Sequence, residues 1–89
     1  MEKPLERVME EILNTTDVFG CVFADHQGLC LGVKGRASTE SAGVIGAIAE
    51  EASKLEPNSR PPVIVLESEN KMCIIQRNGT ITGAIYKLI

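Results

Sequence analysis

The residues whose side chains could bind a metal or take part in catalysis lie close together, in the segment Cys21 to Gly35, which reads CVFADHQGLCLGVKG. It holds the only histidine of the chain, His26, and two of its three cysteines, Cys21 and Cys30. Zinc needs its ligands about 2.0–2.3 Å from one point. The pattern, however, places Cys21 within a strand and His26 in the turn that follows, roughly 16 Å further along. The sequence therefore predicts buried thiols and an exposed turn histidine, and no metal site.

The same segment contains the tetrapeptide Asp25-His26-Gln27-Gly28, an Asp-x-x-Gly of the kind that GTPases place near the γ-phosphate. A phosphate-binding loop requires G-x-x-x-x-G-K-[ST], and the nearby GVKGRAS, residues 32–38, does not have that order. Aspartate first and glycine fourth are the residues that a type I turn prefers. We interpret the tetrapeptide as a turn.

The remaining residues do not indicate nucleophilic catalysis. No serine or cysteine is expected within reach of His26, and Cys73 lies inside an apolar run, where a thiol is poorly reactive. The sequence predicts neither an enzyme nor a cofactor.

The composition limits the partners of the chain. Its 89 residues suit one domain spanning 1–89, and the net charge of −3 comes with scattered basic residues. Three aromatic residues and no basic patch argue against nucleic acid. The first apolar stretch is interrupted by charges, and no run approaches a membrane span, so we expect a cytoplasmic protein without direct membrane insertion.

Apolar spacing predicts the elements that position these residues. A helix with one apolar stripe over residues 3–13 precedes two apolar runs, 17–25 and 29–35, that form a hairpin. A second helix over 37–56 precedes three strands, at 63–68, 72–77 and 80–89, with Asn78-Gly79 as a hairpin signal. The order α-β-β-α-β-β-β predicts an α+β domain, a five-stranded antiparallel sheet with helices packed on its faces.

The second helix carries two neighbouring stripes. Ile45, Ile48, Ala52 and Leu55 form the larger one, and small residues form the other. One stripe should pack on the sheet and the other is left for a second helix; alternatively, the small stripe is simply where the helix crosses its own sheet at short range. The small stripe consists of Ala42, Gly46, Ala49 and Ser53.

The strand 63–68 follows a proline-rich loop and is apolar on both sides. At a sheet edge it would offer unpaired backbone groups to a partner strand. Together with a small-residue helix face, this edge predicts a dimerisation surface.

The segments GCVFADHQGLCLGVKG and ESAGVIGAIAEEASKL resemble the roadblock/LC7 family, and within it the small roadblock subunits of the Ragulator complex, over essentially the whole chain. The resemblance implies a roadblock/longin-like sheet in which two subunits join helix to helix and strand to strand. It also implies heterodimerisation with another roadblock-like Ragulator subunit. Many roadblock domains carry a further helix after the last strand, and for this chain we expect the sheet without it. The interface residues that it implies are Ala42, Gly46, Ala49, Ser53, Val63, Val65 and Glu67.

The resemblance further implies a function. Such a subunit is a non-catalytic scaffold that a lipidated wrapping subunit of Ragulator holds at the lysosomal surface, where the complex recruits Rag GTPases for amino-acid-dependent activation of mTORC1. An alternative is a module that regulates the nucleotide state of the Rag GTPases. For that role the exposed loop residue Arg36 is the candidate contact.

Overall fold

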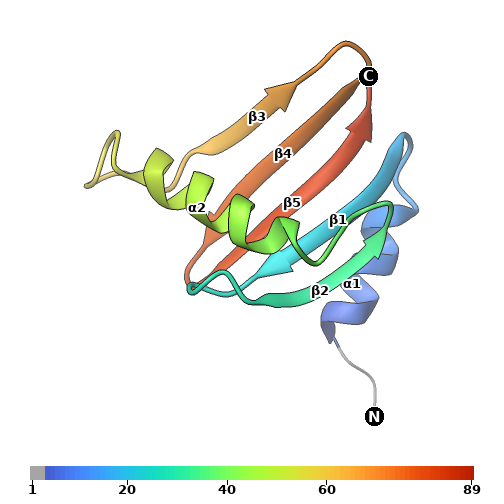
Figure 1. Cartoon of the computed structure of the whole chain (residues 1–89), viewed down its shortest axis with the longest axis horizontal. Helices are drawn as coiled ribbons and strands as arrows, with labels where there is room; N and C mark the ends of the chain where they lie inside the picture. The colour runs from blue at the N-terminus through green and yellow to red at the C-terminus, as the bar shows by residue number, and fades with distance from the viewer. Residues whose placement is uncertain (1–3) are drawn as a thin grey trace.

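The computed structural model describes residues 4–89. Two helices and five strands follow one another in the predicted order (Figure 1). They are α1 (Pro4–Leu13), β1 (Val18–Ala24), β2 (Cys30–Gly35), α2 (Ser41–Ser53), β3 (Val63–Glu67), β4 (Lys71–Asn78) and β5 (Ile81–Leu88).

The strands form one sheet with the order β2-β1-β5-β4-β3, and all neighbouring strands are antiparallel. The central strand β5 joins the β1–β2 hairpin to the β3–β4 hairpin, while β2 and β3 form the two edges. The predicted five-stranded α+β fold is therefore confirmed.

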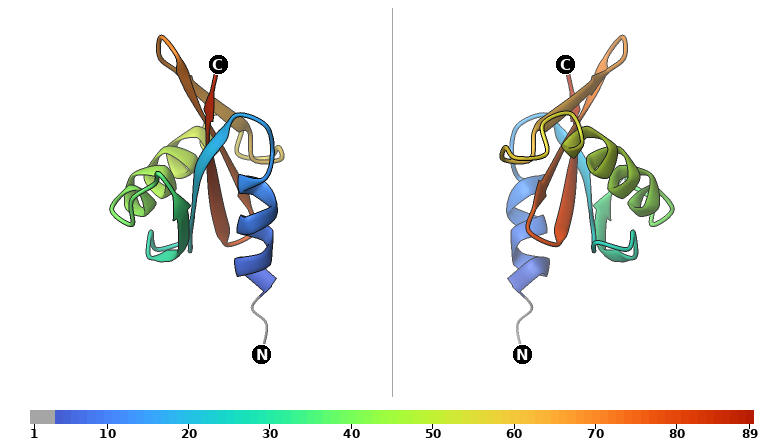
Figure 2. Two further views of the ribbon diagram at one scale, coloured as in Figure 1. Left: turned by 90° about the vertical axis from the view of Figure 1, so that its right-hand side faces the viewer. Right: turned by 90° about the vertical axis from the view of Figure 1, so that its left-hand side faces the viewer.

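The helices lie on opposite faces of the sheet (Figure 2). Helix α1 contacts chiefly β1 and β2, where Met9 lies directly on Gly32: a Cβ at Gly32 would stand 2.7 Å from the Met9 Cε atom. An ion pair between Glu6 and Lys34 joins the same helix to β2, and its hydrogen bond raises the pKa of Lys34. The face on which α1 lies is thus covered mainly at one end.

Helix α2 lies across β1, β5 and β4, and the core of the domain fills the space beneath it. Two of the predicted interface residues belong to this core, since Ala42 and Ala49 are 1% and 2% exposed and pack on their own sheet. The prediction that this stripe faces a partner is wrong for these two alanines, because their small side chains let α2 approach the sheet closely. The core consists of Val22, Ala24, Ala42, Ile45, Ala49, Ile75 and Ala84.

The two hairpin turns differ in how well the sequence predicts them. The turn at Asp25 is confirmed: its Oδ1 accepts hydrogen bonds from the N–H groups of Gln27 and Leu29, at 2.8 and 2.9 Å. These N–H donors, Leu29 first, lower the pKa of the Asp25 carboxyl. At the other hairpin, Asn78 is the last residue of β4 and pairs with Ile81, so the connecting residues are Gly79 and Thr80 rather than Asn78 and Gly79.

The cysteines are less uniformly buried than predicted. Cys21 has no exposed surface, whereas Cys30 and Cys73 are half-buried. Burial raises the pKa of the Cys21 and Cys73 thiols, which disfavours their reactive thiolate forms.

Candidate partner interface

Helix α2 and the turn that follows it present an apolar surface to solvent, which we call the aliphatic flank: Val44 and Ile48 on the helix and Leu55 just beyond it. Val44 is 59% exposed and Leu55 is 82% exposed, while Ile48 is half-buried against the core. Val44 and Ile48 are four residues apart and share one side of the helix, and Leu55 lies two residues beyond Ser53, the last residue of α2. An aliphatic side chain left in water is the feature that a partner surface covers.

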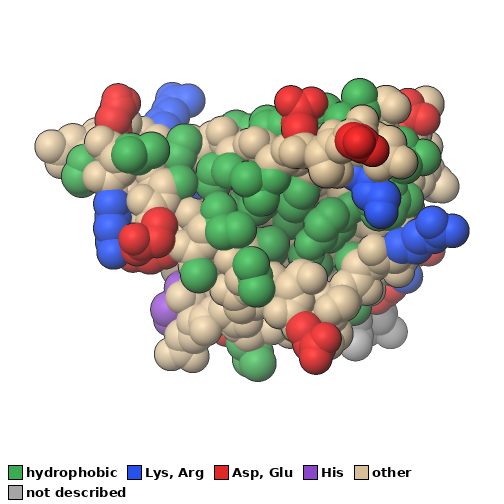
Figure 3. Space-filling view, turned by 45° about the horizontal axis from the view of Figure 1, so that its top comes forward, with side chains coloured by type: hydrophobic (Ala, Val, Ile, Leu, Met, Phe, Trp, Pro, Cys, Tyr) green, Lys and Arg blue, Asp and Glu red, His purple; other side chains and the backbone are tan. Residues whose placement is uncertain are grey.

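The aliphatic flank borders the edge strand β3. Ile64 of β3 and Ile48 of α2 both pack against the margin of the core, and Leu66 is 46% exposed on the same face of the sheet as Ile64. Leu66 also lines a hollow of about 210 Å³ with Cys73 and Tyr86. Figure 3 shows hydrophobic side chains gathered on this side of the molecule. Helix flank and strand edge therefore form one continuous apolar surface.

Strand β3 pairs with β4 on one side only, which leaves its outer backbone edge open for another strand. Its side chains alternate between the two faces of the sheet. Val65 is paired with Ile74, which lies on the face opposite α2, so Val63, Val65 and Glu67 point to that face. The side chains of β3 beside α2 are Ile64 and Leu66, while Val63, Val65 and Glu67 of the predicted strand-to-strand interface lie on the other face of the same open edge strand.

The opposite side of α2, which we call the glycine flank (Gly43 and Gly46), faces the turn of the β1–β2 hairpin. A Cβ at Gly46 would stand 3.6 Å from the Cα of Gly28, and a Cβ at Gly28 would stand 3.3 Å from the Cα of Gly43. The close backbone approach that the helix glycines indicate is thus to the hairpin of the same chain. Gly46 of the predicted interface lies on this flank.

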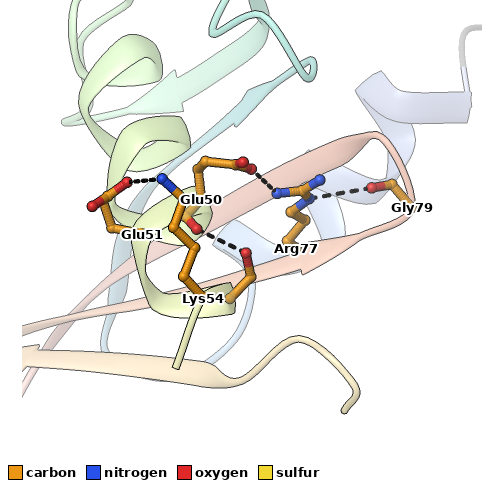
Figure 4. A network of polar contacts seen from close by, with 6 residues as sticks. Glu50, Glu51, Lys54, Arg77 and Gly79 are labelled. Atoms are coloured by element: carbon orange, nitrogen blue, oxygen red, sulfur yellow. Dashed lines mark hydrogen bonds and ion pairs between the residues drawn. The ribbon is translucent and has the colours of Figure 1, made fainter. Parts of the chain in front are cut away.

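Polar contacts fix the C-terminal half of α2 (Figure 4). Glu50 forms an ion pair with Arg77 of β4, and the Nε of Arg77 donates to the Gly79 carbonyl at 3.4 Å. Ser53, the last of the predicted interface residues, is half-buried and its hydroxyl donates to the Glu50 carbonyl at 2.7 Å. Ser53 therefore bonds to the backbone at the helix end and remains partly exposed.

The described part of the sheet has a second uncovered surface, on the face of α1. Phe23, Ile74 and Ile85 line a groove of about 320 Å³ beside α1, with Ile81 at 43% exposure on its margin. Its lining is mostly apolar, and α1 lies over β1 and β2 rather than over β4 and β5. This groove is the second candidate contact surface.

Comparison with known proteins places this geometry in a family. The family model of Ragulator complex protein LAMTOR5 matches residues 1–87. The chain belongs to the LAMTOR5 family. A LAMTOR5 homolog of Nematostella vectensis is 38% identical over 89 residues, covering 99% of this chain and 98% of the relative. LAMTOR5 of Xenopus tropicalis is 36% identical, with the same coverage.

Solved structures of more distant proteins share the fold. A roadblock/LC7 domain from Streptomyces avermitilis matches with a TM-score of 0.74 at 16% identity, covering 97% of this chain and 79% of that one. MglB of Myxococcus xanthus matches with a TM-score of 0.78 at 11% identity, covering 99% and 74%. The LAMTOR5-family chain thus has the roadblock/LC7 fold. Across residues 4–89, neither helix has the length and apolar character needed to cross a membrane.

Arg36 lies where the sequence predicts, in the exposed loop between β2 and α2. Its backbone N–H donates to the Phe19 carbonyl at 2.8 Å, so the loop is attached to β1 while the side chain faces outward. The geometry leaves Arg36 accessible to a large partner.

Sequence reasoning did not single out Val44, Ile64 or Leu66. Val44 stands apart from the two apolar stripes, and the first four residues of the strand 63–68 are all apolar, so both of its faces are apolar. A signal for Val44 was available, since it precedes Ile48 by one helical turn. For Ile64 and Leu66, only the pairing of β3 with β4 decides the face.

Proposed function

We propose that the chain is a non-catalytic scaffold subunit of Ragulator that pairs with another roadblock-like Ragulator subunit. The observation that carries the proposal is the aliphatic flank of α2 beside the open edge of β3. A partner with the same fold would place its own helix on this flank and its own edge strand along β3. Family membership supports the assignment to this complex.

The groove on the face of α1 supports a second contact. We propose that the lipidated wrapping subunit of Ragulator lays an amphipathic segment along Ile74, Ile81 and Ile85. An apolar groove beside an existing helix suits a further helix in the same layer. Membrane attachment of this chain would then come from that subunit.

The assembled complex would act at the lysosomal surface. There it would recruit Rag GTPases and support amino-acid-dependent activation of mTORC1. In this function the chain supplies surfaces and no reacting group, since charged side chains such as Asp25, Lys34 and Glu50 are engaged in turns and ion pairs.

Co-purification tests the pairing. Each roadblock-like Ragulator subunit is co-expressed with the wild-type chain, with Val44→Asp, and with Ala47→Asp as a matched control on an exposed position of the same helix. We expect Val44→Asp to weaken the pairing at least about thirtyfold, the effect of losing about 2 kcal/mol at an interface hot spot. The control should pair normally. Equal pairing by Val44→Asp would contradict the proposed surface, and so would a stable monomer of the wild-type chain mixed with its partner at micromolar concentration.

Ile81→Asp separates the second contact from the first. The variant should keep the roadblock partner and lose the wrapping subunit, and its lysosomal localisation should be lost in cells. Thr80→Asp, in the adjacent turn, is the control. Retention of the wrapping subunit by Ile81→Asp would show that the groove is not its binding surface.

A second candidate function is regulation of the Rag nucleotide state, and the outward position of Arg36 favours it. Nucleotide hydrolysis and exchange by the Rag GTPases are compared in the presence of complexes that contain the wild-type chain or Arg36→Ala. If the complex with Arg36→Ala changes the rate of hydrolysis or of exchange far less than the wild-type complex does, regulation is supported. Unchanged rates would leave the scaffold role as the supported function.

A further inference from the structure

A cleft of about 550 Å³ lies beside the glycine flank, between α2, the hairpin turn and the neighbouring ends of β4 and β5. We call it the turn cleft. It is on the side of α2 away from the aliphatic flank, so a partner on that flank would leave it open. The turn cleft is lined by Asp25, His26, Gln27, Gly28, Gly43, Gly46, Ala47, Glu50, Arg77 and Thr82.

The helix wall of the turn cleft carries almost no side chains. A Cβ at Gly43 would meet nothing within 4 Å, and a Cβ at Gly46 would make only an ordinary contact with Gly28. Alanine would therefore fit at both positions and would favour the helix more than glycine does. The glycines leave the backbone of α2 exposed to whatever occupies the cleft.

Thr82 supplies an unused polar group to the turn cleft. The residue is only 3% exposed, yet its hydroxyl forms no hydrogen bond with the side chains or backbone of residues 4–89. Over the same residues, no fully buried side-chain oxygen lacks a partner, so this hydroxyl opens into the cleft. A polar group in such a position gains from a ligand that bonds to it.

The charges around the turn cleft favour a cation. Asp25 stands on the turn and Glu50 on the helix, and Arg77 is the one arginine or lysine among the lining residues. The backbone N–H groups of the turn stabilise the Asp25 carboxylate and lower its pKa, so it is ionised at neutral pH. Arg77 is paired with Glu50, so the formal charge left over among these three side chains is the negative charge of Asp25.

We propose that the turn cleft binds a basic side chain, arginine or lysine, from a segment of a partner polypeptide. The cation lies between the Asp25 and Glu50 carboxylates, and the Thr82 hydroxyl accepts a hydrogen bond from it. The bare glycine wall admits the main chain of the segment. This binding site is separate from the pairing surface and from the groove beside α1.

Nuclear magnetic resonance on the ¹⁵N-labelled full-length chain tests the site. The probe is acetyl-Gly-Arg-Gly-amide, and acetyl-Gly-Glu-Gly-amide is its matched control. We expect saturable shifts of the Gly28, Gly43 and Thr82 amides with the arginine peptide, with a dissociation constant on the order of 1–10 mM for one solvated charge contact. Added salt should weaken the binding. No saturable shift at tens of millimolar, or an equal response to both peptides, would overturn the proposal.

Variants locate the binding within the turn cleft. Glu50→Gln should weaken binding of the arginine peptide about two- to fivefold, the range of an exposed ion pair, while Glu51→Gln, on the same helix outside the cleft, should not. Thr82→Val, which keeps the side-chain shape, should also weaken it. If Thr82→Val does not fold, Gly43→Leu serves instead, because its side chain enters the cleft and should abolish binding. Unchanged binding in both Glu50→Gln and Gly43→Leu would refute the site.

Discussion

The two flanks of α2 differ in what stands next to them. On the glycine flank, the hairpin turn of the same chain approaches the helix backbone, and Glu50 is attached to Arg77. On the aliphatic flank, Val44 and Leu55 project into water beside β3, whose outer backbone edge is unpaired. Substitutions on the first flank should therefore change the stability of the folded chain, whereas substitutions on the second should change its association.

Gly28 provides the largest expected difference in stability. Its φ is +85°, and a Cβ there would also stand 3.3 Å from the Cα of Gly43. Gly79 has a φ of +65° but open space around it. We expect Gly28→Ala to lower the free energy of unfolding by about 2 kcal/mol and Gly79→Ala by about 1 kcal/mol. Urea unfolding measures both, and equal losses would show that the turn does not press on α2.

Gly43 should respond in the opposite direction. Nothing lies within 4 Å of the position of its missing Cβ, so Gly43→Ala should raise the free energy of unfolding by about 0.5–1 kcal/mol through helix propensity. Val44→Ala, one residue further on, should change stability by less than about 0.5 kcal/mol, because the side chain is mostly exposed. Thermal unfolding of the two variants compares adjacent residues on the two flanks. A destabilised Gly43→Ala would mean that the glycine flank is tightly filled.

The pH dependence of Asp25 is the smallest expected effect. Its pKa is lower in the folded chain than in the unfolded chain, so the stabilisation is present above about pH 4 and is lost as the pH falls through the folded pKa. In the Asp25→Asn variant, the asparagine side chain could still accept hydrogen bonds but would not titrate. The stability difference between the wild type and this variant should therefore shrink between about pH 6 and about pH 3, as measured by urea midpoints. If the stability difference between the two proteins stayed constant with pH, the acid sensitivity would come from other carboxyl groups.

The same comparison explains which parts of the fold were predictable. Turn residues and periodicity were sufficient for the order of elements and for the turn at Asp25, because both depend on local chemistry. The buried face of α2 could not be predicted in this way, since apolar or small residues lie on almost every side of the helix. Ala42 and Ala49 face the sheet because small residues allow a close crossing, which only the packed structure reveals.

Two element boundaries differ between the prediction and the structure for similar reasons. The second helix was expected to begin at residue 37, but α2 begins at Ser41, after a turn in which the Ser38 hydroxyl accepts a hydrogen bond from the Glu40 N–H at 3.1 Å. The second hairpin uses Gly79 at the first connecting position with a left-handed φ, as a type II′ turn requires, so Asn78 stays in the strand. In both cases the element was identified, and its boundary was displaced by one to four residues.

The position of β5 has a consequence for how the chain acquires its structure. The β1–β2 hairpin and the β3–β4 hairpin have no strand contact with each other, and both pair with β5, the last strand in the sequence. During synthesis, the two hairpins would have to wait for residues 81–88 before one sheet could form. Until then β1 and β4 each expose an edge, which is a risk of wrong pairing between nascent chains. Folding should therefore be a late and concerted event, with its rate limited by closing the long loop between β1 and β5.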